Sequence, residues 1–175
     1  MRIYDDVLDD PDPIESFLLS QDFPWHFIQQ SSGGSQKVEG FTDTVQFEHH
    51  FVRNGEVIST GLDPLLKMID WDKVSKKTKV SSSIFRIKSN LLLQTQSTSN
   101  TPHIDYPIPH TVLLYYVNDS DGVTSFYDKN FNIVDTVQPK KGRMVVFDGL
   151  TYHSSTPPQT STHRCVINFN IENPD

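Results

Sequence analysis

The sequence contains a single cysteine, Cys165, in 175 residues. One cysteine excludes an internal disulfide framework and a cysteine-based zinc finger. Positive charge is also scarce, because 15 Lys and Arg stand against 22 Asp and Glu, a formal net charge of −7. This balance argues against a general nucleic-acid binder, which usually carries a basic excess or a basic stripe.

Long apolar runs are missing too. No stretch approaches the roughly 18 consecutive apolar residues of a transmembrane helix. The first residues, Met1 to Asp6, lack the basic region and the apolar run of a signal peptide. We therefore expect a soluble, cytoplasmic protein without a membrane partner, and the length predicts a single domain over residues 1–175.

Aromatic residues and turn residues are plentiful, with 11 Phe, 6 Tyr and 11 Pro, which favours a β-rich fold. Helices are predicted to start at Asp10-Pro11 and at Asp63-Pro64, each followed by an apolar face. Asn54-Gly55 predicts the turn of a hairpin over residues 46–58. Further strands are predicted over residues 82–93, 111–117, 122–127, 132–137, 143–147 and 163–171.

Many short strands with close turn signals indicate a sandwich or barrel, with the helices packed outside one sheet. The expected fold is mainly β (α+β). Residues 1–80 would form a support region of helices and strands, and residues 81–175 the barrel core. The basic run from Lys73 to Lys79 is interpreted as a solvated turn.

Three residues suggest a metal site. His103 and Asp105 are two positions apart, so in extended backbone their side chains share one face. His153 follows fifty positions later, after several predicted strands, and can return from across a barrel. Two imidazoles and one carboxylate form the facial triad of non-heme iron(II), which leaves three positions open. A His-x-Asp by itself is a weak signal, and its alternative is a polar turn without a metal.

Two further residues point to an anion. Arg164 lies inside the predicted last strand, where a cation is costly unless an anion meets it. A guanidinium pairs bidentately with a carboxylate. Tyr116 ends a predicted strand and can add a phenol donor. Taken singly, Arg164 would be interpreted as a surface residue and Tyr116 as a core aromatic. Their joint occurrence with the triad favours the interpretation as an anion site.

The order and spacing of these motifs resemble the iron(II)- and 2-oxoglutarate-dependent dioxygenases, and among them the prolyl 4-hydroxylase-like branch. The resemblance covers about residues 91–171. The segments that carry it are His103-Ile104-Asp105, Leu114-Tyr115-Tyr116-Val117-Asn118, Gly122-Val123-Thr124-Ser125-Phe126, residues 139–147, His153-Ser154 and His163-Arg164.

The resemblance implies a double-stranded β-helix of the jelly-roll or cupin type, with two or so supporting helices. His103, Asp105 and His153 match the iron ligands. Arg164 and Tyr116 match the groups that bind the distal carboxylate of 2-oxoglutarate. The implied cofactors are Fe(II) and 2-oxoglutarate, with ascorbate as a further candidate.

Strand parity adds three polar residues to the expected pocket. Asn168 and Asn170 share the face of Arg164 in an extended strand, and Asn90 lies on the strand before the His-x-Asp loop. On that strand the family often has a Tyr, whereas this chain has Leu91-Leu92-Leu93.

The expected function is hydroxylation of a C–H bond with O2, as 2-oxoglutarate is decarboxylated to succinate. The substrate is an unidentified peptide, protein or small molecule. By analogy with the prolyl 4-hydroxylase-like branch, the hydroxylated group would be a prolyl or other residue of a peptide or protein. Two alternatives stay open: a nucleic-acid N-demethylase with the same cofactors, against which the acidic balance argues, and a non-enzymatic metal-binding β-barrel module.

Overall fold

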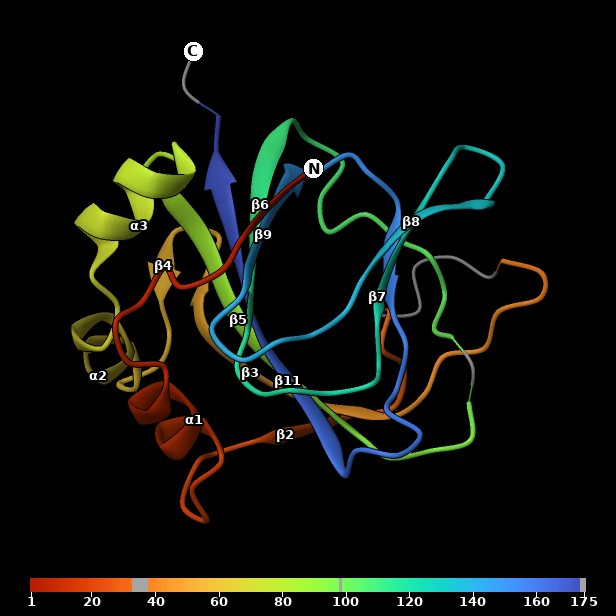
Figure 1. Ribbon diagram of the computed structural model, residues 1–175, viewed down its shortest axis with the longest axis horizontal. Helices are drawn as coiled ribbons and strands as arrows, with labels where there is room; N and C mark the ends of the chain where they lie inside the picture. Colours follow the sequence, from red (N-terminus) through yellow and green to blue (C-terminus); the bar gives the residue numbers. More distant parts are fainter. Residues whose placement is uncertain (33–37, 98, 174–175) are drawn as a thin grey trace.

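The computed structural model describes residues 1–32, 38–97 and 99–173. Within these ranges the chain forms three short helices and two antiparallel sheets (Figure 1). The helices are α1 (Asp12–Leu18), α2 (Leu62–Lys67) and α3 (Trp71–Thr78). The strands are β1 (Arg2–Tyr4), β2 (His26–Ile28), β3 (Gln46–Arg53), β4 (Glu56–Val57), β5 (Ile84–Leu93), β6 (His110–Tyr116), β7 (Thr124–Tyr127), β8 (Ile133–Val137), β9 (Met144–Asp148), β10 (His153–Ser155) and β11 (His163–Glu172).

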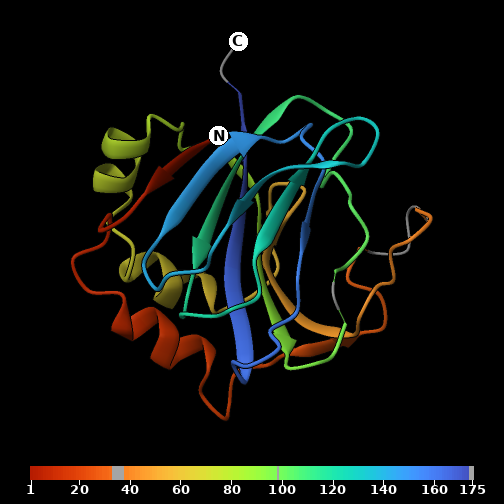
Figure 2. The same cartoon turned by 45° about the vertical axis from the view of Figure 1, so that its right-hand side comes forward.

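The larger sheet has the strand order β1-β9-β6-β11-β5-β3-β2, with β4 paired to β3, and the smaller sheet has the order β10-β7-β8. The smaller sheet lies across one face of the larger one (Figure 2). An apolar cluster joins the two, because Phe126 of β7 and Val137 of β8 pack with Leu114, Phe147 and Val166 of the larger sheet. Two facing antiparallel sheets of this kind form the expected double-stranded β-helix.

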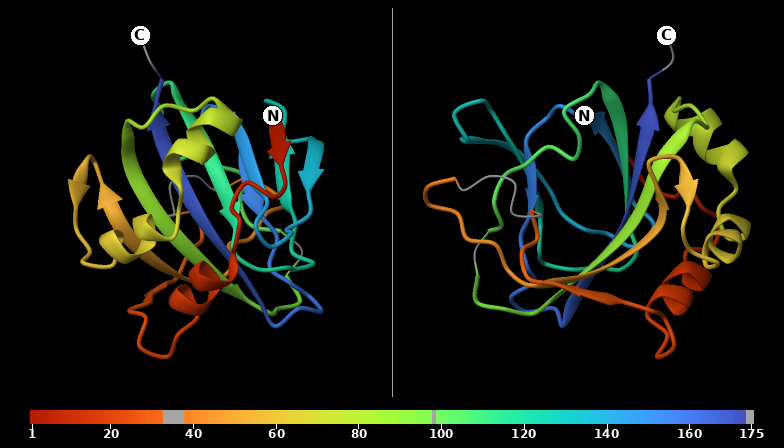
Figure 3. Two further views of the ribbon diagram at one scale, coloured as in Figure 1. Left: turned by 60° about the vertical axis from the view of Figure 1, so that its left-hand side comes forward. Right: turned by 180° about the vertical axis from the view of Figure 1, so that it is seen from behind.

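Alternation along β11 divides the molecule into an inner and an outer face. Cys165, Ile167, Phe169 and Ile171 belong to the apolar core that also holds buried residues of all three helices. The alternate residues from Arg164 to Asn170 therefore point to the other face of the sheet, toward the space between the two sheets. The helices cover only the outer face of the larger sheet, as the views in Figure 3 show.

The two predicted helices are present as α1 and α2, but α3 was not expected. Its N-cap, Asp70, accepts a hydrogen bond from the backbone N of Lys73 at 3.0 Å, and Val74 is buried. The interpretation of residues 73–79 as a solvated turn is therefore wrong. The lysines occupy the outer side of the helix, where Lys77 donates to the carbonyl oxygens of Asp5 and Asp6 at 3.0 Å.

The predicted hairpin and the long strands are confirmed. Asn54 and Gly55 have φ angles of 52° and 79°, as a tight turn between β3 and β4 requires. The sequence interpretation missed β1, β2 and β10, each of which has three residues. Strands this short carry too few alternations to be recognised from periodicity.

Strands from both expected parts of the chain share the larger sheet: β1 to β4 come from residues 1–80, and β5, β6, β9 and β11 come from residues 81–175. Within the described residues, none of the helices combines the length and the apolar character needed to cross a bilayer.

Candidate metal centre and co-substrate pocket

The structure brings His103, Asp105 and His153 together. One ligand atom from each residue lies within 4.8 Å of the other two. His103 lies in the loop between β5 and β6, and His153 is the first residue of β10. The grouping expected from the sequence therefore exists in the fold, on the inner side of the larger sheet.

The tautomer of each histidine is set by a backbone carbonyl. His103 Nδ1 lies 3.1 Å from the carbonyl oxygen of Thr101, and His153 Nδ1 lies 3.0 Å from that of Thr151. A carbonyl oxygen only accepts, so each Nδ1 must carry the proton and donate it. In the neutral form of each ring, Nε2 then carries the lone pair with which imidazole binds a metal.

Asp105 is held by three side chains. Asn168 and Asn170 of β11 each donate an amide N–H to its Oδ2 at 2.8 Å, and Arg86 of β5 lies 3.1 Å from its Oδ1. Burial alone would raise the pKa of this carboxyl group. The charge of Arg86 and the neighbouring histidines outweigh it and hold the pKa well below its usual range. Asp105 is therefore an anion before any metal arrives.

Burial also affects His103. It lowers the pKa of the imidazole to about 4, helped by the nearby His153 and opposed by Asp105. The ring is thus neutral at physiological pH. Two imidazoles and one carboxylate form a donor set that suits a divalent first-row metal, with coordination positions left for other ligands.

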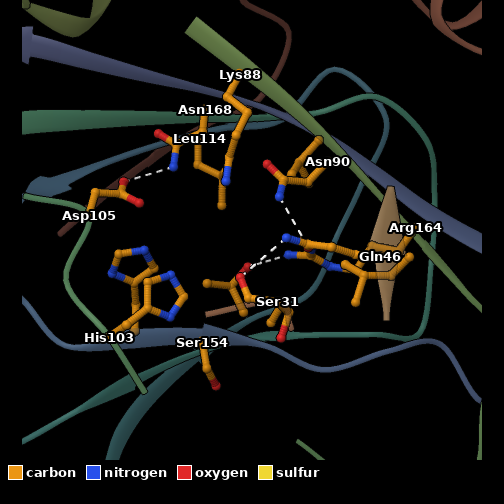
Figure 4. A pocket seen from close by; sticks show the side chains of 15 residues that line it. Ser31, Gln46, Lys88, Asn90, His103, Asp105, Leu114, Ser154, Arg164 and Asn168 are labelled. Atoms are coloured by element: carbon orange, nitrogen blue, oxygen red, sulfur yellow. Dashed lines mark hydrogen bonds between the residues drawn. The ribbon is translucent and has the colours of Figure 1, made fainter. Parts of the chain in front are cut away.

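A pocket extends from this triad into the space between the sheets. Figure 4 shows His103 and Asp105 on one side of it and Arg164 on the other. The side chains that line it are Ser31, Gln46, Lys88, Asn90, Leu92, His103, Asp105, Leu114, Thr124, His153, Ser154, Ser155, Arg164, Val166 and Asn168.

Arg164 is the strongest indication of what this pocket holds. Its side chain is only 2% exposed, and it donates from Nε to the carbonyl oxygen of Gly122 at 2.8 Å and from Nη2 to Thr124 Oγ1 at 2.7 Å. These bonds leave donors of the guanidinium fork for a ligand. In the described ranges no carboxylate forms an ion pair with Arg164. A buried cation of this kind requires an anion, and the distal carboxylate of 2-oxoglutarate meets that requirement.

Tyr116 lies behind this arginine. Its hydroxyl is 2.6 Å from Thr124 Oγ1, its ring centroid is 5.6 Å from the Arg164 guanidinium carbon, and it is not among the pocket-lining residues. The structure thus places Tyr116 where it orients Thr124 and Arg164. Direct contact between its phenol and the co-substrate stays a prediction.

The three asparagines have separate positions. Asn90 lines the pocket and donates to Gln46 Oε1 at 3.1 Å. Asn168 lines the pocket as well, but its amide N–H donates to Asp105 Oδ2. Asn170 is fully buried between Asp105 and Arg86, whose Nη1 donates to Asn170 Oδ1 at 3.2 Å. The shared inward face that strand parity predicted is present, and on it two asparagines support the metal ligand.

Sequence reasoning missed Arg86 and Lys88, which point to the same inner face. On β5 they alternate with the predicted Asn90, and in the pairing with β11 Lys88 lies opposite Asn168 and Arg86 opposite Asn170. The alternation that led to Asn90 would have reached both if extended back along the strand. No comparable signal pointed to Thr124, whose hydroxyl becomes relevant only through its contact with Arg164.

Fold and donor set together form a candidate non-heme metal centre on a double-stranded β-helix. A family model described as the 2OG-Fe(II) oxygenase superfamily matches residues 90–172. This segment, slightly less than half of the chain, carries the sequence pattern of that superfamily. The resemblance inferred from the sequence is confirmed.

Solved structures share the fold at low sequence identity. A 2OG-Fe(II) oxygenase-family oxidoreductase from Burkholderia pseudomallei has a TM-score of 0.64 at 11% identity, covering 85% of this chain and 73% of that one. A prolyl hydroxylase from Trichoplax adhaerens, in complex with a peptide of hypoxia inducible factor, has a TM-score of 0.62 at 14% identity, covering 98% and 83%. The alpha ketoglutarate dependent epimerase SnoN from nogalamycin biosynthesis has a TM-score of 0.63 at 14% identity, covering 97% and 77%. A search of curated proteins found no significant match.

Proposed function

We propose that this protein hydroxylates a C–H bond of an organic substrate, using Fe(II), O2 and 2-oxoglutarate, within a single domain over residues 1–175. The observation that carries the proposal is the pairing of two sites in one pocket. The metal triad lies on one side, and a buried arginine without a carboxylate partner in the described residues lies on the other. A dicarboxylate that binds a metal through one end and a guanidinium through the other matches this pair.

The residues of the pocket would have two separate roles, metal binding and co-substrate binding. His103, Asp105 and His153 would hold Fe(II), and Arg164 would hold the distal carboxylate of 2-oxoglutarate, with Thr124 and Tyr116 keeping the guanidinium in place. When bound, the metal and co-substrate supply oxygen activation, coupled to decarboxylation of 2-oxoglutarate to succinate. The carbonyl groups of Thr101 and Thr151 keep the protons on the far nitrogens of the two imidazoles.

The surroundings of the pocket limit side reactions. Leu92, Leu114 and Val166 line it between the triad and Arg164, and all three are buried. Apolar walls exclude water from the space in which the co-substrate and O2 would meet, and so protect the reaction from unproductive proton delivery. Leu92, which belongs to the Leu91-Leu92-Leu93 run on the strand where the family often has a tyrosine, contributes to this wall.

The test has a spectroscopic part and a chemical part. Anaerobic addition of Fe(II) and 2-oxoglutarate should produce a visible metal-to-ligand charge-transfer band, and admission of O2 should yield succinate. His153→Ala should abolish both, because the triad loses one of its three ligands. A folded wild-type protein that shows neither band nor succinate would refute the proposal and favour a metal-binding module. The accessory role expected of ascorbate is tested by running the succinate assay with and without it.

A further inference from the structure

A second hollow opens beside the metal ligands, on the side of β2 and β3, with a volume of about 380 Å³. Its lining comes from β2, β3, β5 and the loop that carries the His-x-Asp pair. The lining residues are Ile28, Gln30, Ser31, Ser32, Gln46, Glu48, His50, Arg86, Lys88, His103, Ile104 and Asp105. His103 and Asp105 line this cleft as well as the inner pocket, so a molecule bound in the cleft would lie next to the candidate metal ligands.

The chemistry of the cleft is polar. Of its described lining residues only Ile28 and Ile104 are apolar, and none is Phe, Tyr or Trp. A small-molecule site is usually lined by apolar and aromatic side chains with a few polar groups that fix orientation. The prolyl ring of a peptide would find little apolar surface here and would form no hydrogen bond with the charged groups of the cleft.

Lys88 provides a cationic site in this cleft. Its side chain is 12% exposed, and its ammonium group pairs with Glu48 Oε2 at 3.2 Å. An ammonium group has three N–H donors, and this pairing uses one of them. Arg86, the neighbouring cation, contacts Asp105 and Asn170 through Nη1, and its Nε has no partner in the described residues. Lys88 contacts neither Asp105 nor Asn170, and two of its three N–H donors are left for an anionic group of a substrate.

Glu48 and His50 provide acceptors directly next to that cation. The two oxygens of Glu48 contact Lys88 and His50 Nε2, the latter at 3.1 Å, and each keeps a further lone pair. Burial would raise the pKa of Glu48, but the contacts with His50 and Lys88 outweigh it and bring the pKa to about 2. Burial also lowers the pKa of His50, so its Nε2 donates and its buried Nδ1 is an acceptor with no partner in the described residues.

We propose that the substrate is a free α-amino acid, with its carboxylate on Lys88 and its ammonium group on Glu48. This inference rests on the proposed function and narrows its substrate. An α-amino acid carries both charges on one carbon, which matches a lysine and a glutamate whose charged atoms are 3.2 Å apart. Its side chain then extends toward His103 and Asp105, which line the same cleft.

The same chemistry disfavours a residue inside a peptide chain. An internal prolyl or other residue presents amide groups in place of the ammonium and carboxylate, so it would compete poorly with the Lys88–Glu48 ion pair. When the free amino acid binds, Lys88 exchanges Glu48 for the carboxylate of the amino acid, and Glu48 exchanges Lys88 for its ammonium group. A neutral analogue offers neither charge, so it leaves the Lys88–Glu48 ion pair in place and gains no charge-assisted hydrogen bond from it.

The probes are the twenty free L-amino acids, each compared with its N-acetyl amide and with a proline-rich peptide. Each is added anaerobically to the Fe(II)–2-oxoglutarate complex, and the readout is a shift of the charge-transfer band. At least one free amino acid should shift the band, with its blocked form binding at least about tenfold more weakly. Lys88→Met and Glu48→Gln should each weaken binding of the free amino acid by a similar factor. Lys76→Met, on the outer side of α3, should leave that binding unchanged.

Three results would overturn the proposal. The first is that none of the twenty shifts the band, and the second is that the blocked forms or the peptide bind as well as the free amino acids. The third is that Lys88→Met loses affinity for 2-oxoglutarate but not for the amino acid, which would assign Lys88 to the co-substrate. Failure of the proposed function itself is visible separately, because the band would then be absent before any amino acid is added.

Discussion

His103 and His153 are paired through their backbones as well as through their side chains. The N–H of each residue donates to the carbonyl oxygen of the other at 3.0 Å, in a single antiparallel bridge outside the regular ladders. Their ring centroids are consequently 4.9 Å apart. Two candidate metal ligands fifty positions apart in the sequence are thus brought together by the main chain.

Metal binding should stabilise this protein measurably, because the ligands are already assembled in the folded state and dispersed in the unfolded chain. With free Fe(II) at one hundred times its dissociation constant, the gain should be roughly 2.7 kcal/mol. For a chain of this size that corresponds to a rise in Tm of roughly 5–10 °C.

Anaerobic thermal denaturation with Fe(II) or with a chelator measures this rise. His103→Ala should lose most of it, whereas His26→Ala, an exposed histidine on β2, should keep it. An equal rise in His103→Ala would show that the metal binds elsewhere.

Replacement of Arg164 by methionine should weaken 2-oxoglutarate binding strongly. Methionine keeps apolar volume in the buried site but leaves the distal carboxylate without its cation. Truncation of one partner of a buried charge pair costs about 2–5 kcal/mol, so the dissociation constant should rise at least about thirtyfold. Titration of the charge-transfer band with 2-oxoglutarate measures it. Arg2→Met, at an exposed position of β1, is the matched control, and unchanged affinity in Arg164→Met would place the co-substrate elsewhere.

Asn170 should act on the metal through Asp105. It is fully buried, does not line the pocket, and donates to Asp105 Oδ2 at 2.8 Å. Loss of a group that orients a metal ligand typically costs 10- to 100-fold in metal affinity, and we expect a loss of about that size for Asn170→Ala. Iron titration measures the effect, with Asn130→Ala in an exposed turn as the control. A variant that only unfolds more readily, with unaltered iron affinity, would reduce Asn170 to a packing role.

The ion pair between Asp5 and Arg143 should make stability depend on pH in the acid range. Arg143 donates from Nε and Nη2 to the two carboxylate oxygens at 2.8 and 3.0 Å, and these bonds lower the pKa of Asp5 from 3.8 to about 2. A lowered folded-state pKa contributes stability that is present above about pH 4 and is lost as the pH falls toward 2.

Asp5→Asn should therefore be less stable than wild type at pH 7, by up to about 1 kcal/mol because the carboxylate is one-third exposed. The difference should vanish near pH 2. Urea denaturation across this range measures it, with Asp22→Asn, at an exposed loop position, as the control. A difference that stays constant down to pH 2 would mean that the ion pair is not its source.

The site residues differ in how readily the sequence reveals them. His103 and Asp105 were found because spacing alone puts two ligand-type side chains on one face, and Arg164 because a cation inside an apolar strand needs an explanation. Lys88, Glu48 and Thr124 were missed, because each is an ordinary polar residue until its neighbours from other strands are known. The helix at residues 71–78 was missed for a related reason: its lysines suggested a turn, while Val74 packs on the sheet.

Local chemistry in the chain determines the types of its elements and indicates its candidate metal ligands. Strand alternation, the Asn54-Gly55 turn and the His-x-Asp spacing act over a few residues, and their physical effects can be read without the fold. Only the tertiary structure decides the contacts made across strands. The amides of Asn168 and Asn170 meet Asp105, and Lys88 meets Glu48, because hydrogen bonding in the larger sheet sets the register of β11, β5 and β3. A shift of one residue in that register would turn every one of these side chains to the opposite face.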